Sequence, residues 1–299
     1  MTTGALLVTG ATGFVGSQLV RRLVRDGWQV HVVCRHGSNL ECLREALPLL
    51  TVHRHDGSTA NLIAIMKTVQ PVVVFHLASL FISEHQPDQI DLLVNANLLF
   101  STQLAEAMFR CDIKRLVNTG TSWQHYHSDG YNPVNLYAAT KQAFEDILRY
   151  YIEAADFRVI TLKLYDTYGP EDLRPKLFHL LEKVAREGTP LAMSPGEQMI
   201  DLVYIDDVVQ AFLMAAERLM ECRTPGHESY AVSCGEPLSL RKLVDTYERI
   251  AHTHLTIEWG GRHYHSREVM STWICRNILP GWAPETSLEK GISFISKHS

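Results

Sequence analysis

The chain has 299 residues, of which 46% are hydrophobic and 20% charged, and its formal net charge is −5. This composition fits one large globular domain, or a domain with a smaller lobe, and the scattered basic residues exclude nucleic acid and anionic membranes as expected partners. No apolar run reaches the ~20 residues of a membrane-spanning helix, and no secretion signal precedes the first expected strand. The six dispersed cysteines suit a reducing compartment, so we expect a cytoplasmic protein.

Short β-branched runs alternate with amphipathic stretches through the first half of the chain. Strands are expected at residues 5–9, 30–34, 50–53, 72–78, 115–120 and 158–164, and helices at residues 14–27, 91–109 and 136–154. Strands that are apolar on both faces and separated by helices form a parallel sheet covered on both sides. Right-handed crossovers then predict the fold class, an α/β protein with a doubly wound parallel sheet.

A glycine triplet, Gly10, Gly13 and Gly16, lies between the first expected strand and the first expected helix. Glycines at this turn allow a tight bend and a close approach of backbone to ligand. The helix N-terminus then presents its amides and dipole to a pyrophosphate. A lone triplet is weak evidence, but this one follows the first strand of an α/β pattern, as dinucleotide binding requires. The motif therefore predicts a bound dinucleotide rather than a purely structural turn.

The end of the second expected strand distinguishes NAD from NADP. A carboxylate there favours NAD, because it accepts a hydrogen bond from the free 2′-hydroxyl of the adenine ribose. Here the position holds Cys34 followed by Arg35, whose planar guanidinium can grip a 2′-phosphate. We therefore expect NADPH (NADP) as the cofactor. Asp56, after the third strand, is expected to accept from the adenine amino group.

Tyr137 and Lys141 lie four residues apart at the start of an expected helix, so their side chains share one face. A phenol titrates near ~10, and a neighbouring cation favours its ionised form. The pair is therefore a candidate acid/base unit. A buried tyrosine beside a solvated lysine would give the same spacing.

The second half of the chain is less regular and is interrupted by Gly and Pro. Ser239 and Thr286 are expected to cap helices, the latter through a Thr-x-x-Glu capping box with Glu289. No linker or internal repeat separates the halves. We expect a dinucleotide-binding Rossmann domain at residues 1–165, to which residues 200–228 return, and a smaller α/β substrate-binding lobe at residues 166–199 and 229–299.

The glycine triplet, Tyr137 and Lys141, in this order, resemble the extended short-chain dehydrogenase/reductase family (the NAD-dependent epimerase/dehydratase type) over essentially the whole chain. The motifs that carry the resemblance are TGATGFVG, the DG at 56–57, FHLAS, the helix with Asn97, TGTS, YAATK and YGP. The resemblance implies that Tyr137 donates its proton to a carbonyl oxygen as hydride reaches the carbon. It also implies that Lys141 depresses the pKa of the phenol and holds the nicotinamide ribose.

The same resemblance supplies the remaining site residues. The catalytic Thr121 would bond the reacting oxygen, with Ser122 as an adjacent substitute. The expected cofactor-binding residues are Gly10, Thr12, Gly13, Phe14, Val15, Gly16, Arg35, Ser38, Asp56, Gly57, Leu77, Ala78, Ser79, Asn97, Thr119, Tyr137, Lys141 and Leu164. The expected substrate-binding residues are Thr121, Ser122, Trp123, Asp166, Arg174, Lys176 and Arg267, the last three as diphosphate and nucleotide contacts.

Two further departures from the family pattern concern the substrate. Tyr137 follows Thr121 by only 16 residues, a shorter connection than is usual, so the substrate rim is reduced there. Lys163 and Asp166 stand where the family has Arg-x-x-Asn before YGP, which leaves the usual Asn contact to the substrate open.

The residues after Thr121 bear on the reaction. Related dehydratases carry an Asp-Glu pair there because elimination needs an extra acid and base, and dual-function epimerase-reductases carry a Cys two positions on. This chain has Ser122 and Trp123, and simple ketoreduction needs neither group. The strings DTYGPEDLRPKL and GWAPETSLEKGI most resemble sugar-nucleotide 4-ketoreductases, including those that make CDP-linked 3,6-dideoxyhexoses such as abequose or paratose. His179 is retained as a minor candidate for a second acid.

The expected function is therefore NADPH-dependent reduction of the 4-keto group of a nucleoside-diphosphate-linked 6-deoxy or 3,6-dideoxy hexose, for deoxysugar biosynthesis. One alternative is an NAD-dependent sugar-nucleotide 4-epimerase, and another is a non-catalytic NADP-sensing binding protein. Four His-x-His pairs, at 53/55, 125/127, 252/254 and 263/265, raise the question of a metal. No carboxylate or Cys cluster completes a site, so no metal is expected.

We also expect a homodimer. In the resembling family, helices equivalent to residues 91–109 and 137–153 pair with their symmetry mates in a four-helix bundle. Leu99, Leu104, Phe144 and Leu148 are expected near that two-fold contact. The alternative is that these residues face the sheet.

Overall fold

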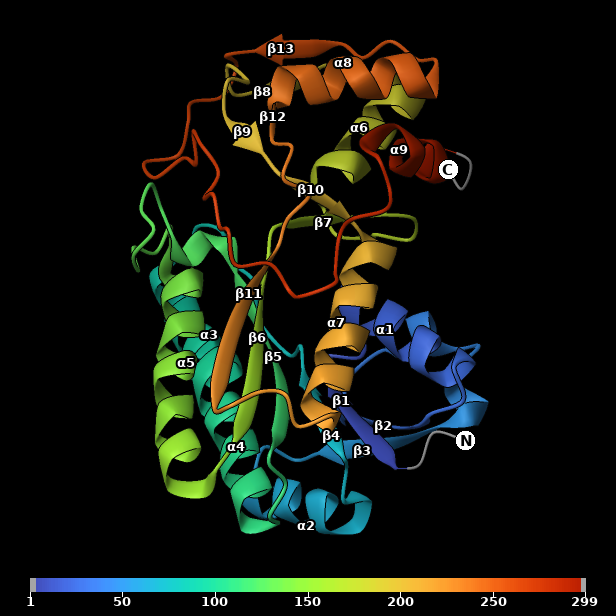
Figure 1. Ribbon diagram of the computed structural model, residues 1–299. Helices are drawn as coiled ribbons and strands as arrows, with labels where there is room; N and C mark the ends of the chain where they lie inside the picture. The colour runs from blue at the N-terminus through green and yellow to red at the C-terminus, as the bar shows by residue number, and fades with distance from the viewer. Residues whose placement is uncertain (1–3, 297–299) are drawn as a thin grey trace.

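The computed structural model describes residues 4–296, and a seven-stranded sheet dominates its larger lobe (Figure 1). Its strands, in spatial order, are β11 (His227–Val232), β6 (Arg158–Leu164), β5 (Arg115–Thr121), β4 (Val73–His76), β1 (Ala5–Thr9), β2 (Gln29–Arg35) and β3 (Leu50–His55). Every neighbouring pair is parallel. The strand order reverses between β1 and β4, so the predicted doubly wound sheet is confirmed.

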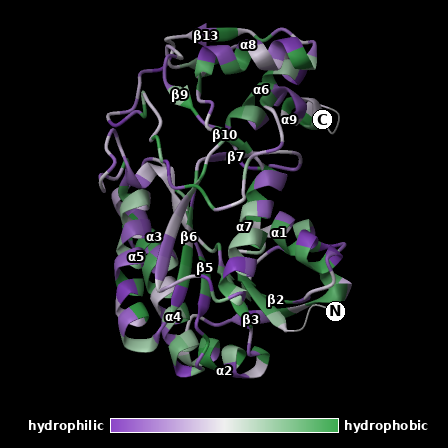
Figure 2. Ribbon diagram, viewed as in Figure 1, coloured by the Kyte–Doolittle hydropathy of each residue, from purple (hydrophilic) through white to green (hydrophobic). Residues whose placement is uncertain are grey.

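Helices cover both faces of this sheet because its strands are apolar on both sides. Leu6 and Val8 of β1 belong to one core with α1 (Phe14–Arg25) and α7 (Ile205–Met220). Ala5 and Leu7 point the other way, into a second core with α2 (Thr59–Val69), α4 (Phe100–Arg110) and α5 (Leu136–Ala155). Figure 2 shows the hydrophobic character of β5 and β6 between these layers. This alternation follows from the two-residue period of a strand.

The six predicted strands are all present. Two of them, β1 and β6, have the predicted bounds, and the other four differ at their ends by one or two residues. The predicted helix at 91–109 is divided into α3 (Ile90–Val94), a π-helical turn (Asn95–Leu99) and α4. Short 3₁₀ turns occur at Glu41–Leu43, Leu47–Leu49, Pro87–Gln89 and Ser122–Gln124. Within residues 4–296, no helix is both long and apolar enough to cross a membrane.

A smaller lobe lies beyond the carboxyl ends of the large sheet's strands (Figure 1). Its strand pairs are β7 (Asp166–Tyr168) with β10 (Leu202–Tyr204), β8 (Leu191–Met193) with β13 (Ile257–Trp259), and β9 (Met199–Ile200) with β12 (Leu238–Ser239). Its helices are α6 (Leu177–Glu187), α8 (Leu240–Ala251) and α9 (Leu288–Ser296). The division of the chain at residues 165, 199 and 228 stays a prediction.

One of the two predicted helix caps in this lobe is correct. Ser239 caps α8, because its side chain accepts from the amide of Lys242. The prediction of Thr286 as a cap is wrong by one residue, since the Ser287 hydroxyl accepts from the amide of Lys290 at 3.3 Å. The Thr286 amide instead donates to the Asp207 carboxylate at 3.1 Å. Asp207 thereby ties the C-terminal segment to α7.

The residues expected at a dimer contact divide into two groups. Leu104, Phe144 and Leu148 are at most 1% exposed and belong to the core under the sheet, so their placement at the contact is wrong. Leu99 is 49% exposed and lies on the outer side of the helical layer, as does the exposed Tyr150. The helices α4 and α5 are apolar on the faces that turn toward the sheet. These faces pack in the core of the monomer and are not available for a dimer contact.

Candidate active site

The glycine triplet forms a cradle between β1 and α1. Gly10 has φ of +73°, and a Cβ on it would lie 2.5 Å from the Ala78 amide nitrogen. A Cβ on Gly16 would collide with the Gly10 carbonyl oxygen. No side chain caps α1 at Gly13, so the amides of its first turn point out of the helix end. A pyrophosphate fits this cradle, because the missing side chains leave the backbone open to an anion.

The carboxyl ends of β2 and β3 place two arginines side by side. Arg35 ends β2 and is exposed, and its carbonyl oxygen accepts from Arg54 Nη1 at 2.8 Å. The sequence analysis did not identify Arg54. Its position directly after the third expected strand was visible in the sequence, but only the β2–β3 register pairs it with Cys34. Two guanidinium groups therefore lie where a carboxylate would mark NAD binding.

The other predicted cofactor residues cluster at the same edge of the sheet. Asp56 is exposed, and the hydrogen bond from the Ser58 amide lowers the pKa of its carboxyl group. That bond forms an Asx turn before α2, so one carboxylate oxygen already has a partner. Thr12, Val15, Ser38, Gly57, Leu77, Ala78, Thr119 and Leu164 lie at strand ends, in the loops after them, or in the first turn of α1.

Asn97 is buried, and protein groups occupy its amide. Its Oδ1 accepts from the Leu80 amide at 2.7 Å and from the Ser79 hydroxyl at 3.1 Å. Its Nδ2 donates to the Leu80 carbonyl at 2.9 Å and to the Thr140 hydroxyl at 3.1 Å. Asn97 therefore holds the loop after β4 against α5. A direct contact of Asn97 with the cofactor stays a prediction.

Tyr137 lies in the first turn of α5, which begins after Asn135, whose Oδ1 accepts from the Ala138 amide. The ring of Phe81 packs edge-on against Tyr137, with centroids 5.0 Å apart. Desolvation raises the pKa of Tyr137 to about 12, although the Ser79 hydroxyl and the Arg174 charge oppose the shift. The opposing cation is thus Arg174, and depression of this pKa by Lys141 stays a prediction.

Lys141 follows Tyr137 by one turn and is 3% exposed. Burial lowers the pKa of its ammonium to about 8, and the charge of Glu145 one turn later opposes that shift. Tyr137, Lys141 and Glu145 therefore share one face of α5. Tyr137 and Lys141 thus share a helix face, as expected. Lys141 is buried, whereas the alternative interpretation required a solvated lysine.

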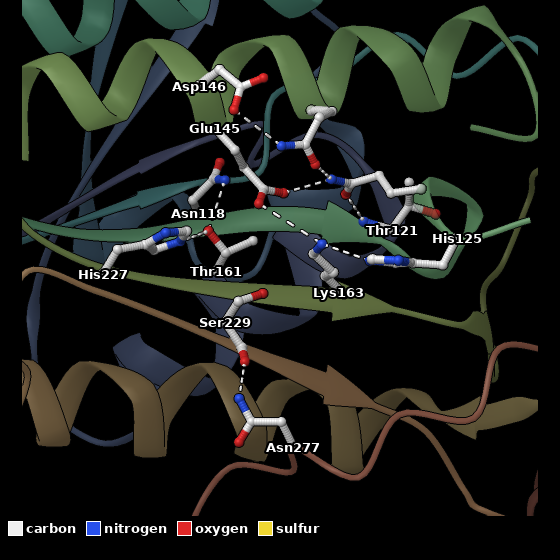
Figure 3. A network of polar contacts seen from close by, with 12 residues as sticks. Asn118, Thr121, His125, Glu145, Asp146, Thr161, Lys163, His227, Ser229 and Asn277 are labelled. Carbon is white, nitrogen blue, oxygen red and sulfur yellow. Dashed lines mark hydrogen bonds and ion pairs between the residues drawn. The ribbon is translucent and has the colours of Figure 1, made fainter. Parts of the chain in front are cut away.

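A buried polar network joins this face of α5 to the end of β5 (Figure 3). The Thr121 amide donates to Gln124 Oε1 at 3.0 Å, and Gln124 Nε2 donates to Glu145 Oε1 at 2.8 Å. The Thr121 hydroxyl accepts from the Trp123 amide at 3.3 Å, so its own proton is available for another acceptor. The network fixes the backbone that carries Thr121 relative to the helix that carries Lys141.

The network continues to the surface through Lys163 and His125, on the other side of Glu145. Lys163 Nζ lies 3.9 Å from Glu145 Oε2 and 2.8 Å from His125 Nε2. Burial lowers the pKa of His125, and its Nδ1 lies 3.0 Å from the Gly130 carbonyl oxygen. A neutral imidazole with its proton on Nδ1 satisfies both contacts. The sequence analysis missed this role of His125, although the Gln-His pair directly follows Trp123.

A cleft of about 610 Å³ opens beside these residues, between the two lobes. Four predicted substrate residues line it: Ser122, Trp123, Asp166 and Arg267. Two cleft residues that the sequence analysis missed are Gln198 and Trp273, the latter stacked on His125 with ring centroids 3.8 Å apart. Thr121, Tyr137 and Lys141 are not among the lining residues. Phe81 packs between Tyr137 and Trp123 at that end of the cleft.

The three predicted diphosphate cations are not brought together. Arg267 lines the cleft, donates to Asn132 Oδ1 at 2.8 Å and lies over the Tyr126 ring. Lys176 lies 3.4 Å from Asp166 Oδ1 and 5.4 Å over the Phe81 ring. Arg174 does not line the cleft and lies over Phe14, the first residue of α1, so its contact with the substrate stays a prediction.

The His-x-His pairs have separate partners. His53 contacts His31, His125 contacts Lys163, and His265 contacts Glu84. Across residues 4–296, no group of three His, Cys, Asp or Glu side chains is placed to hold a metal ion. His179 lies on α6 and does not line the cleft.

The fold and this site together define an oxidoreductase that uses a nicotinamide dinucleotide. A model of the NAD dependent epimerase/dehydratase family matches residues 6–230, and the chain belongs to this family. Over 293 residues it is 27% identical to a CDP-abequose synthase of Salmonella muenchen, and the alignment covers 96% of this chain and 95% of that protein. Over 314 residues it is 26% identical to a UDP-glucose 4-epimerase of Mycolicibacterium smegmatis, which covers 96% of both.

Among solved structures, MoeE5 in complex with UDP-glucose and NAD has a TM-score of 0.82 and 25% identity, over 99% of this chain and 98% of that one. These findings confirm the predicted family and identify the protein as an enzyme that modifies sugar nucleotides with a nicotinamide cofactor. The identities of this chain to the two curated relatives, 27% and 26%, differ by one percentage point, so overall identity does not decide between synthase and epimerase.

Glu145→Gln tests the electrostatic coupling within the site. The substitution keeps an oxygen that accepts from Gln124 but removes the charge that raises the pKa of Lys141. With that charge gone, the ammonium loses its proton at lower pH, so the alkaline limb of the turnover profile should shift down by about 1 pH unit. The profile of kcat between pH 6 and 10 measures this shift. Asp146→Asn, at the exposed neighbouring position, is the control, and equal profiles for all three proteins would contradict the coupling.

Proposed function

We propose that the enzyme uses NADPH to reduce the 4-keto group of a nucleoside-diphosphate-linked 6-deoxy or 3,6-dideoxy hexose, in deoxysugar biosynthesis. The observation that carries this proposal is that no acid or base side chain directly follows Thr121 beside the Tyr137–Lys141 pair. Tyr137 and Lys141 share a face of α5, and Ser122 and Trp123 follow Thr121 without an extra acid or base. Reduction of a ketone needs one proton and one hydride, whereas elimination needs a further acid/base pair.

The chemistry assigned to this chain's residues follows from their protonation states. A phenol with a pKa of about 12 is protonated at neutral pH, so Tyr137 is suited to donate a proton to the ketone oxygen. The Thr121 hydroxyl, which accepts from the Trp123 amide, would donate a hydrogen bond to the same oxygen and keep its own proton. With the cofactor bound, Lys141 would hold the nicotinamide ribose. Its positive charge lies one turn of α5 after Tyr137. A bound nicotinamide cofactor supplies the hydride.

A 4-epimerase is the second candidate, and the relation to UDP-glucose 4-epimerase supports it. An epimerase must first oxidise its substrate, so it needs the tyrosine as a base, which a raised phenol pKa disfavours. Arg35 and Arg54 also favour a 2′-phosphate over the free hydroxyl of NAD. A non-catalytic NADP sensor has no need for the Tyr137–Lys141 pair.

The test of the proposal is a panel of CDP-, dTDP-, GDP- and UDP-linked 4-keto-6-deoxysugars with NADPH. One molecule of NADPH consumed per product, with a new hydroxyl at C4 in the NMR spectrum, supports reduction. A parallel assay supplies the same nucleotides linked to 4-hydroxy sugars, and inversion at C4 without net cofactor consumption there supports the epimerase instead. Absence of either reaction with the whole panel would contradict both.

Tyr137→Phe should lower turnover by roughly 10²–10⁴-fold, because it removes the general acid and keeps the ring. NADPH affinity should change little, since the glycine cradle and Arg35 are proposed to supply most of it. Steady-state kinetics and cofactor titration measure the two effects separately. Tyr131→Phe, at an exposed tyrosine, should keep wild-type turnover. Near-wild-type turnover by a folded Tyr137→Phe protein would overturn this role.

Arg35→Ala and Arg54→Ala should each weaken NADPH binding by about 1–3 kcal/mol and leave NADH binding nearly unchanged. Each removes one charged partner of the 2′-phosphate. Cofactor titration of the two variants gives the comparison. Arg44→Ala, which removes an exposed arginine paired with Glu41, should affect neither cofactor. Equal efficiency of NADH and NADPH with the wild-type enzyme would rule out the cofactor assignment.

We further propose a cytoplasmic homodimer whose contact includes the exposed apolar side chains of α3, the π-helical turn after it and α5. Leu92, Leu99 and Tyr150 lie on this outer surface. A two-fold contact through it would form a four-helix bundle. Leu99→Glu should yield a monomer by light scattering at micromolar concentration, because it places a charge in the apolar contact. Leu49→Glu, at another exposed leucine, should stay dimeric, and a monomeric wild-type protein would disprove the proposal.

A further inference from the structure

The segment after β7 lies against the start of α1, where the dinucleotide cradle begins. Arg21 Nη2 of α1 lies 2.7 Å from Glu171 Oε2 of this segment. Three residues later, the Arg174 guanidinium carbon lies 4.6 Å from the centre of the Phe14 ring. Phe14 is the first residue of α1 and directly follows Gly13. Arg174 is therefore next to the helix end at which a pyrophosphate would bind.

The guanidinium group of Arg174 is held in place without a ligand. Its Nε and Nη2 lie 2.6 Å and 2.7 Å from the two carboxylate oxygens of Asp172, and Nη2 also donates to the Thr167 carbonyl at 3.1 Å. All hydrogen bonds of the guanidinium group to residues 4–296 come from Nε and Nη2. The Nη1 amino group is thus left to meet a ligand, and the side chain is 34% exposed.

Arg174 is also near enough to the catalytic tyrosine for its charge to oppose the desolvation that raises the pKa of Tyr137. The same guanidinium thus lies over Phe14 at the start of α1 and acts electrostatically on Tyr137. A dinucleotide whose pyrophosphate lies at the α1 N-terminus and whose nicotinamide lies beside Tyr137 must follow the same path. The nicotinamide-side phosphate and ribose would occupy the middle of that path.

We propose that Arg174 Nη1 binds the nicotinamide-side phosphate of the cofactor, and that Arg174 is a cofactor-binding residue rather than a contact of the sugar nucleotide. The proposal rests on the proposed function only in requiring a bound nicotinamide dinucleotide beside Tyr137. The α1 amides offer a dipole to the pyrophosphate, and Arg174 adds a full positive charge with a fixed orientation. Asp172 supplies that orientation.

Titration of the wild-type enzyme and Arg174→Gln with NADPH, without any sugar nucleotide, tests the proposal. The variant should bind NADPH at least about tenfold more weakly, because it loses a charge-assisted hydrogen bond to phosphate. Adenosine 2′,5′-bisphosphate, which lacks the nicotinamide-side phosphate, should bind both proteins within about twofold. Arg267→Gln, in the cleft, should leave NADPH binding unchanged.

Two results would overturn the proposal. The first is unchanged NADPH binding by Arg174→Gln together with a raised KM for the sugar nucleotide, which would return Arg174 to the substrate. The second is equal weakening of NADPH and of the bisphosphate, which would show an effect on the whole cradle. Asp172→Asn keeps the guanidinium but loosens it, so it should weaken NADPH binding less than Arg174→Gln does, and the reverse order would also count against the proposal. If the enzyme prefers NADH, the same comparison with NADH and AMP tests Arg174 independently of the cofactor choice.

Discussion

The burial of one ammonium group organises this active site. Lys141 lies in the core with 3% of its surface exposed, and a buried cation is unstable without compensation. Glu145 supplies the opposite charge one turn further along α5. Glu145 must in turn be hydrogen-bonded, and it accepts from Gln124, whose own oxygen accepts from the Thr121 amide. The need to stabilise Lys141 therefore also positions Thr121.

The same carboxylate links the site to the substrate cleft. Lys163 lies near Glu145 and contacts His125, which stacks on Trp273 in the lining of the cleft. Lys163 stands where the family pattern has an arginine. Its ammonium lies near Glu145 and has His125 as its second partner. The cleft wall at Trp273 is thus connected to the charge beside Lys141 through three side chains, His125, Lys163 and Glu145. The neutral form of His125 fits this arrangement, because a second cation beside Lys163 would be repelled.

The parallel sheet accounts for the remaining geometry. Because all seven strands run in one direction, the loops that follow them meet at a single edge. The glycine cradle, the Arg35–Arg54 pair, the loop held by Asn97 and the end of β5 all lie there. The small lobe covers this edge, so the cleft has Ser122 and Trp123 on one side and Gln198 and Arg267 on the other. The edge and the cleft are thus built from different segments of the chain, the edge from the large sheet and much of the cleft from the small lobe.

The sequence by itself determined the fold class, the strands of the sheet, the cradle and the family. Strand and helix periods are local, and the order of TGATGFVG, TGTS, YAATK and YGP is preserved along one chain. Only the tertiary structure decided which apolar side chains of α4 and α5 face the sheet, because both Leu99 and Leu104 suit a helix surface or a core. It also decided that Arg174 faces Phe14 rather than the cleft, since the direction of a long side chain depends on Asp172 and Thr167. The network through Glu145, Lys163 and His125 joins residues that are distant in sequence, and no local pattern records such contacts.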